Sequence, residues 1–158
     1  MTMFDAKIRD FQVESNKIEG IEGATDKEVR ELGWFINLPS PRLADVSNYV
    51  KVCQSNAVVR DRIGLDVRVG NHTPPPGGPM VIEALVSMLK VSHLYNAFEY
   101  YCMYENLHPY TDGNGRSGRA LWLWHHSRYA SDRGALALKR GFLHSFHYES
   151  LDAQDARK

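Results

Sequence analysis

The chain is organised around one short stretch, His108-Pro109-Tyr110-Thr111-Asp112-Gly113-Asn114-Gly115-Arg116-Ser117-Gly118-Arg119. The residues before it, from Ile82 to Leu107, place apolar side chains at helical spacing. Pro109 and the glycines then act as helix-stopping signals. The sequence therefore predicts a helix that ends at His108, followed by a glycine-rich loop and a second helix.

The loop between these two predicted helices has the features of an anion-binding site. Gly113 and Gly115 allow positive φ, so that backbone N–H groups can point inward, and Asn114 tolerates the same bend. A second helix that begins near Asn114 or Gly115 would add its positive dipole end to this site. Arg116 and Arg119 would then share one helix face. On the loop alone, an ordinary surface turn is the alternative, since Asp-Gly and Asn-Gly dipeptides are common in turns.

The side chains around the loop supply the parts of a phosphoryl- or nucleotidyl-transfer site. A neutral His108 imidazole can accept a proton. Asp112 can hold a hard divalent cation such as Mg²⁺ beside phosphate groups. The guanidinium groups of Arg116 and Arg119 can each bind phosphate oxygens through two hydrogen bonds.

These residues resemble the signature of Fic-domain proteins, His-Pro-Phe-x-[Asp/Glu]-Gly-Asn-Gly-Arg-x-x-Arg. The one departure is Tyr110 where Phe is usual, and it retains the aromatic ring but adds a hydroxyl that needs a partner. The resemblance implies a protein adenylyltransferase that moves AMP from ATP, with Mg²⁺ as cofactor, to a Ser, Thr or Tyr hydroxyl of a target protein. The target can be another protein or the chain itself.

The resemblance also implies a role for each residue of the stretch at 108–119. His108 would be the general base, and Asp112 would hold Mg²⁺. The residues implied to bind the nucleotide phosphates are Gly113, Asn114, Gly115, Arg116 and Arg119, with Arg119 nearest the γ-phosphate.

A second motif lies in the N-terminal segment 10–23, which we expect to be helical. Its residues Ser15-Asn16-Lys17-Ile18-Glu19-Gly20 are similar to the inhibitory pattern [Ser/Thr]-x-x-x-Glu-[Gly/Asn] of many Fic proteins. By this resemblance Glu19 would form an ion pair with Arg119 and occupy the guanidinium that should bind the γ-phosphate. The alternative is an ordinary helix that Gly20 and Gly23 terminate.

Residues 64–72 alternate between apolar and polar side chains, with Leu65, Val67 and Val69 on one side. This period of two predicts a strand, and Gly70-Asn71 offers a turn, so that we expect a β-hairpin. Fic proteins have a flap hairpin before the motif that binds the main chain of the target. The resemblance therefore implies a flap at this position, with a purely structural hairpin as the alternative.

Other signals predict further helices upstream of the motif. Thr25 and Glu28 have the spacing of a capping box and predict a helix start. Pro39 and Pro41 break this helical pattern, and an amphipathic helix follows from Asp45.

We expect an all-α single domain over residues 1–158 that carries the small β-hairpin flap. Hydrophobic residues make up 43% of the 158 residues, which is enough for a core. The 19 basic and 19 acidic residues balance, so that no bias toward nucleic acid or anionic membranes is expected. We expect no membrane span and no signal peptide. Cys53 and Cys102 are expected to be reduced thiols in a cytoplasmic protein.

Two other functions stay open at this level. The same site could use another nucleotide donor or remove AMP, with Glu19 then orienting water, because the motif contacts phosphates rather than the base. A nucleotide-binding regulatory module without turnover is the other hypothesis, although it would not need the base His108. A homo-oligomer also stays open.

Overall fold

Local capping signals start several helices in the computed structural model, which describes residues 3–129. In α2 the Thr25 side chain accepts a hydrogen bond from the Glu28 N–H at 3.1 Å, and the Glu28 carboxylate accepts one from the Thr25 N–H at 2.8 Å. This is the capping box that the sequence predicts. The helices of the described residues are α1 (Met3–Ile18), α2 (Asp26–Ile36), α3 (Leu43–Cys53), α4 (Pro79–Lys90), the 3₁₀ helix η1 (Ser92–Leu94), α5 (Ala97–Leu107) and α6 (Asn114–Tyr129).

The expected continuous helix before the loop is in fact two helices, α4 and α5, separated by η1. A second capping box causes the break. The Asn96 side chain accepts from the Glu99 N–H at 2.8 Å, and the Glu99 carboxylate accepts from the Asn96 N–H at 3.3 Å. The apolar spacing continues across the break because both helices pack on the same core, so the pattern concealed the interruption.

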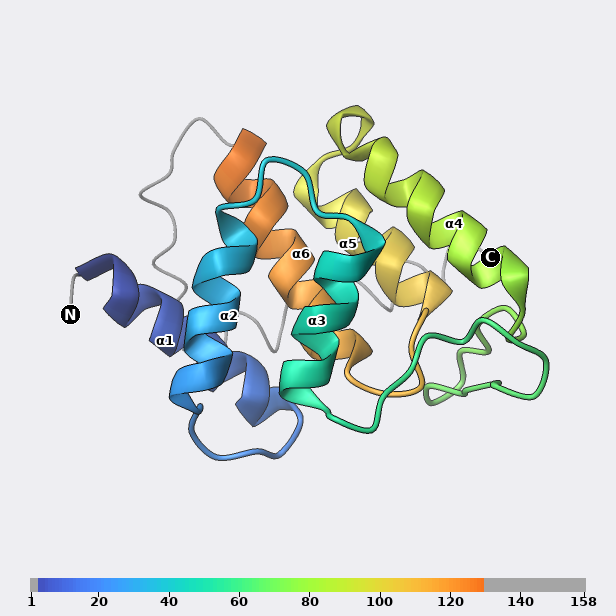
Figure 1. The fold of residues 1–158 in the computed structure, drawn as a ribbon, viewed down its shortest axis with the longest axis horizontal. Coiled ribbons are helices and arrows are strands. Elements are labelled where there is room, and N and C mark those ends of the chain that lie inside the picture. The colour runs from blue at the N-terminus through green and yellow to red at the C-terminus, as the bar shows by residue number, and fades with distance from the viewer. Residues whose placement is uncertain (1–2, 130–158) are drawn as a thin grey trace.

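Helix α6 lies in the middle of the domain and contacts α1, α2, α3 and α5 (Figure 1). Its residues Ala120–Trp124 are all buried, as expected for a helix that is apolar on every side. Helix α1 packs against it through Phe11, whose ring stacks on Trp122 with 6.4 Å between ring centroids. The start of α6, where the quoted motif lies, is thus held between α1 and α3 on one side and α5 on the other.

The predicted β-hairpin at 64–72 is not formed, and residues 3–129 contain no β-strand. Val69 and His72 make one isolated bridge with backbone hydrogen bonds of 3.0 and 2.9 Å around Gly70-Asn71. Leu65, Val67 and Val69 are half-buried, whereas their polar neighbours are exposed. The alternation therefore reflects one side of an extended segment that lies against the helices, and it did not require a partner strand.

Three expectations concern the chain as a whole. No helix among residues 3–129 is long and apolar enough to cross a bilayer. Cys53 and Cys102 are not joined by a disulfide, as expected. The part of the predicted domain at 130–158 lies outside the described residues.

Candidate active site

His108 ends helix α5 in a left-handed backbone conformation, with φ 50° and ψ 62°. Residues other than glycine rarely adopt this conformation, so the surroundings must stabilise it. Arg60 does so by donating from Nε to the His108 carbonyl at 2.7 Å and from Nη2 to the Leu107 carbonyl at 2.9 Å. A cationic side chain thereby binds the carbonyl groups that α5 leaves unpaired at its C-terminus. The predicted position of His108 at a helix terminus is confirmed.

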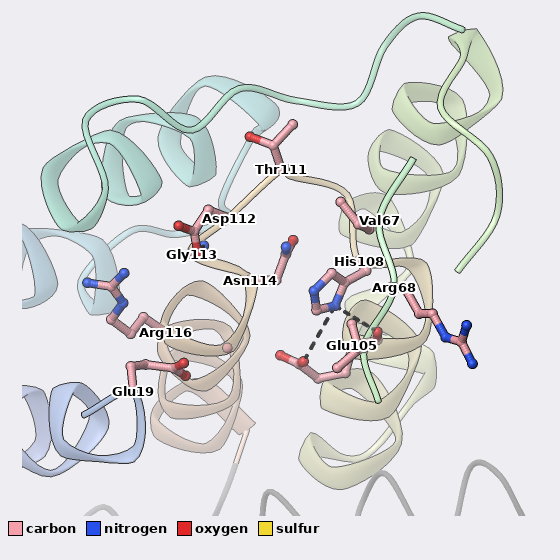
Figure 2. A pocket seen from close by; sticks show the side chains of 12 residues that line it. Glu19, Val67, Arg68, Glu105, His108, Thr111, Asp112, Gly113, Asn114 and Arg116 are labelled. Atoms are coloured by element: carbon pink, nitrogen blue, oxygen red, sulfur yellow. Dashed lines mark hydrogen bonds and ion pairs between the residues drawn. The ribbon is translucent and has the colours of Figure 1, made fainter. Parts of the chain in front are cut away.

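The His108 imidazole is largely buried, with 15% of its side chain exposed. Burial lowers its pKa to about 4, so that the ring is neutral at pH 7. Its Nδ1 atom faces Glu105, with the backbone carbonyl of that residue at 3.4 Å and the carboxyl Oε2 at 4.0 Å (Figure 2). Two oxygen atoms near Nδ1 favour a proton on that nitrogen, which leaves Nε2 able to accept one.

The loop from Pro109 to Gly113 is closed by the side chain of Asn114. The Asn114 carboxamide accepts from the Tyr110 N–H and donates to the Tyr110 carbonyl, both at 2.8 Å. Gly113 has φ 76°, as predicted, and α6 begins at Asn114. Asn114 is thus buried and holds the loop shape through its side chain.

Gly115 does not have the positive φ that we expected. It lies in the first turn of α6, and the reason for a glycine there is space. A Cβ atom at this position would lie 2.5 Å from Glu19 Oε1 and 3.0 Å from Arg119 Nη1. The absence of a side chain therefore allows Glu19 and Arg119 to approach the helix backbone.

Arg119 is completely buried and binds the C-terminal end of α1 and the residue that follows it. Its Nε donates to Ser15 Oγ at 2.8 Å, and its Nη2 donates to the Ser15 carbonyl at 3.0 Å and to Glu19 Oε1 at 2.8 Å. Residues 100 positions apart therefore form the ion pair that the family resemblance implied. Its Nη1 has no hydrogen-bond partner within residues 3–129.

The Arg116 side chain binds the end of α3, whereas that of Arg119 binds α1. Arg116 Nη1 donates to the Cys53 carbonyl at 2.9 Å, and its Nη2 donates to Gln54 Oε1 at 3.2 Å, at the end of α3. Each of the two guanidinium groups is occupied by protein groups. They do not jointly flank an open anion site in this arrangement.

A pocket of about 390 Å³ brings most of the predicted residues together. Figure 2 shows Glu19 and Arg116 on one side of it, across from His108 and Arg68. Arg119 does not line the pocket. The residues that line it are Glu19, Val67, Arg68, Val69, Glu105, His108, Thr111, Asp112, Gly113, Asn114, Gly115 and Arg116.

The groups around Asp112 fit Mg²⁺ bound together with a nucleotide. Asp112 is exposed at the pocket, and one of its oxygen atoms accepts from the Gly113 N–H at 2.7 Å. No cluster of three His, Cys, Asp or Glu side chains among residues 3–129 could hold a metal ion by itself. Mg²⁺ usually takes one or two protein carboxylates and completes its coordination with phosphate and water, so a single carboxylate suffices.

The loop is further anchored to the extended residues 58–60. Val59 and Tyr110 form an isolated antiparallel bridge, and the Thr111 N–H donates to the Val58 carbonyl at 2.9 Å. The Tyr110 hydroxyl finds its partner in Ser47 Oγ, at 2.6 Å. The replacement of Phe by Tyr is therefore accommodated by a hydrogen bond to α3.

Sequence reasoning assigned no role to Arg60 or Glu105. Arg60 lies in an irregular segment where no periodicity marks it as buried, and only the tertiary structure reveals it. Glu105 carried a readable signal, because it is an acidic residue in helical register with Tyr101 and Cys102 on the buried face of α5.

A family model for the Fic/DOC family matches residues 47–125, which is half of the chain. The chain therefore belongs to the Fic/DOC family. The matched region contains most of α3, all of α4 and α5, the loop and most of α6, and thus every pocket residue except Glu19. Comparisons with curated proteins and with solved structures returned no match.

Proposed function

We propose that this protein is an adenylyltransferase that transfers AMP from ATP to a Ser, Thr or Tyr hydroxyl of a target protein. Members of the Fic/DOC family are typically nucleotidyltransferases, and the chain belongs to that family. The observation that carries the proposal is the pocket that gathers His108, Asp112 and the N-terminus of α6. A base, a carboxylate and a helix N-terminus around one cavity suit nucleotidyl transfer.

In the proposed reaction His108 is the general base. Its Nε2 accepts the proton of the target hydroxyl as the hydroxyl oxygen attacks the α-phosphorus of ATP. The new P–O bond forms while the bond to pyrophosphate breaks, and pyrophosphate leaves with the electron pair. Because burial keeps His108 neutral at pH 7, the base is ready for proton transfer without prior deprotonation.

The loop and α6 would bind the phosphate groups. The backbone N–H groups of Gly113, Asn114 and Gly115 lie at the positive end of the helix dipole, which favours anions. Arg116 and Arg119 would contribute guanidinium groups once they exchange their present partners for phosphate oxygens. Mg²⁺, held by Asp112 and the phosphates, would neutralise part of the negative charge of the triphosphate.

We further propose that Glu19 restrains this activity. The Glu19–Arg119 ion pair occupies Arg119 Nη2, and Arg119 is buried behind Glu19 rather than exposed to the pocket. A phosphate group would have to compete with this carboxylate for the guanidinium. Removal of Glu19 would leave Arg119 available, and we expect the transfer rate to rise.

The test is mass spectrometry of the full chain carrying Glu19→Gly, incubated with Mg²⁺ and ATP in the presence of lysate proteins. We expect a mass increase of one AMP on the chain or on a lysate protein. Glu19→Gly/His108→Ala is the matched control and should show no adduct, because it lacks the base. Wild type should show less adduct than Glu19→Gly.

Two outcomes would redirect the proposal. An adduct that forms only with another nucleotide donor would preserve the mechanism and change the substrate. The absence of any adduct, together with loss of AMP from a modified protein, would favour AMP removal by the same site.

A further inference from the structure

Glu105 on α5 is a carboxyl group at the pocket that the proposed transfer step does not use. Its side chain is 2% exposed, and it lines the pocket beside His108 (Figure 2). Its Oε1 atom is buried and has no hydrogen-bond partner in the described part of the chain. Buried polar atoms nearly always have partners, so this orphaned atom indicates a role other than stability.

The packing between α5 and α6 leaves room for this carboxyl group. Gly118 of α6 lies opposite, and a Cβ atom there would collide with Glu105 Oε1 and lie 3.2 Å from its Cδ atom. Placing a carboxyl group in such an interface costs free energy that an apolar side chain would not. The glycine at position 118 thus makes room for the Glu105 carboxyl group, although Oε1 of that group forms no hydrogen bond within the described residues.

The second oxygen atom of Glu105 faces the general base. Oε2 lies 4.0 Å from His108 Nδ1, and the backbone carbonyl of Glu105 lies 3.4 Å from the same nitrogen. That carbonyl contact is at the long end of the hydrogen-bond range. A catalytic histidine usually has a third group that acts on its far nitrogen. The Glu105 carboxyl lies beyond hydrogen-bond distance of Nδ1 but within ion-pair distance, so that its charge acts on that nitrogen.

We propose that Glu105 is a positioning residue for His108. Its carboxyl group acts electrostatically on His108 Nδ1 and favours the proton on that nitrogen, so that Nε2 remains free to accept the proton of the target hydroxyl. When ionised, the carboxylate also stabilises the imidazolium ion that forms at that step. This inference rests on the proposed function of His108 as general base.

The charges around Glu105 determine when it ionises. Burial raises its pKa to about 8, the Arg119 guanidinium on α6 lowers the pKa, and the Glu19 carboxylate raises it further. Glu105 is therefore neutral at pH 7 and gains its charge on the alkaline side. Removal of Glu19 takes away a negative neighbour and eases this ionisation.

Some of the charged groups that face His108 lower its pKa and others raise it. Arg60, from the extended segment, and His72 lower its pKa, while Glu19 raises it. An ionised Glu105 would add the negative charge nearest to Nδ1 and so make His108 a stronger base. We expect transfer to become faster as the pH rises through about 8.

The first experiment measures kcat and KM for ATP from pH 6 to 9 in the activated Glu19→Gly chain. We expect kcat to rise with a midpoint near or below pH 8. In Glu19→Gly/Glu105→Gln this rise should be absent, and KM for ATP should be unchanged. At pH 9, kcat should be about tenfold lower than in Glu19→Gly, because a positioning residue supplies only a part of the effect of a general base. Glu19→Gly/Glu99→Gln, the same change on the same helix, should retain the rise because Gln also completes a capping box.

The second experiment needs no turnover. ¹⁵N NMR of the His108 ring in the full wild-type chain should show the Nδ1–H tautomer at pH 7 and a shift with its midpoint near pH 8. The shift should persist in Glu99→Gln and vanish in Glu105→Gln. Gly118→Ala, which retains the carboxyl group but displaces it, should also abolish it and serves if Glu105→Gln fails to fold.

Identical His108 titrations in wild type and in Glu105→Gln would overturn the inference. An unchanged pH profile of kcat in Glu19→Gly/Glu105→Gln would do the same. If every variant lacks transfer activity but the NMR titration behaves as expected, the Glu105–His108 pair stands and the proposed reaction fails.

Discussion

At the scale of single residues, burial shifts two neighbouring titratable groups in opposite directions. The pKa of Glu105 rises from 4.5 to about 8, and that of His108 falls from 6.5 to about 4. The folded state thus retains a proton on Glu105 that the unfolded state loses, which lowers the free energy of unfolding as the pH rises. His108 has the opposite effect below pH 6.5, so that the two contributions largely cancel between about pH 4.5 and 6.5.

Above pH 6.5 only the Glu105 contribution remains, up to about pH 8. We predict that the Glu105 contribution lowers the free energy of unfolding of wild type by up to about 2 kcal/mol between these pH values. Glu105→Gln should lack this decrease, whereas Glu99→Gln should retain it. Urea denaturation at pH 6.5 and 8 measures the difference, and equal decreases in all three proteins would contradict the prediction.

At the scale of helices, the contact between α1 and α6 depends on few polar groups. Ser15 is completely buried and accepts hydrogen bonds from Arg119 through both its hydroxyl and its carbonyl oxygen. It therefore fixes the end of α1 over the start of α6, where Glu19 follows. Without the hydroxyl, Arg119 Nε would lose its acceptor in a buried place.

We predict that Ser15→Ala raises AMP transfer part of the way to the level of Glu19→Gly. The lost acceptor should also lower the free energy of unfolding by about 1–3 kcal/mol. Transfer rates and urea denaturation measure the two effects. Ser87→Ala, at an exposed position of α4, is the control and should change neither. If Ser15→Ala transfers AMP no faster than wild type while Glu19→Gly is activated, Ser15 does not support the restraint by Glu19.

Helix starts that carry a capping residue were the features that this sequence predicted most directly. Thr25 and Glu28 marked α2 correctly, because a cap acts within one turn and needs no distant partner. The same signal at Asn96 and Glu99 was not used, and α4 and α5 were merged. The segment 64–72 was misread because its alternation reports contact with the helices on one side and says nothing about strand pairing.

At the scale of the molecule, Arg60 connects segments that are far apart in the sequence. Its completely buried guanidinium group donates to the carbonyls of Leu107 and His108 at the end of α5. It also donates to the carbonyls of Leu65 and Pro75, at 3.1 and 2.8 Å. One side chain therefore joins the irregular residues 65–75 to the start of the loop that follows α5.

We predict that Arg60→Met lowers the free energy of unfolding by about 3 kcal/mol or more, because four carbonyl groups lose a charged donor. Arg62→Met is the matched control. Arg62 is exposed and donates from Nε to the adjacent Asp61, so the change should stay within about 0.5 kcal/mol. Equal stabilities of the two variants in urea denaturation would refute the role given to Arg60.

The residues predicted for the candidate site came from the resemblance to Fic-domain proteins. The sequence by itself determined the helical class, the end of α5 beside His108 and the start of α6 near Asn114. These follow from local rules, since capping groups, glycine and proline act on the backbone within a few residues. Only the tertiary structure decided that Gly115 serves close approach rather than positive φ, that Arg116 binds the end of α3, and that Glu105 and Arg60 surround His108. Such contacts depend on which side chains meet across helices, and one-dimensional periodicity records that a residue is buried without recording its partner.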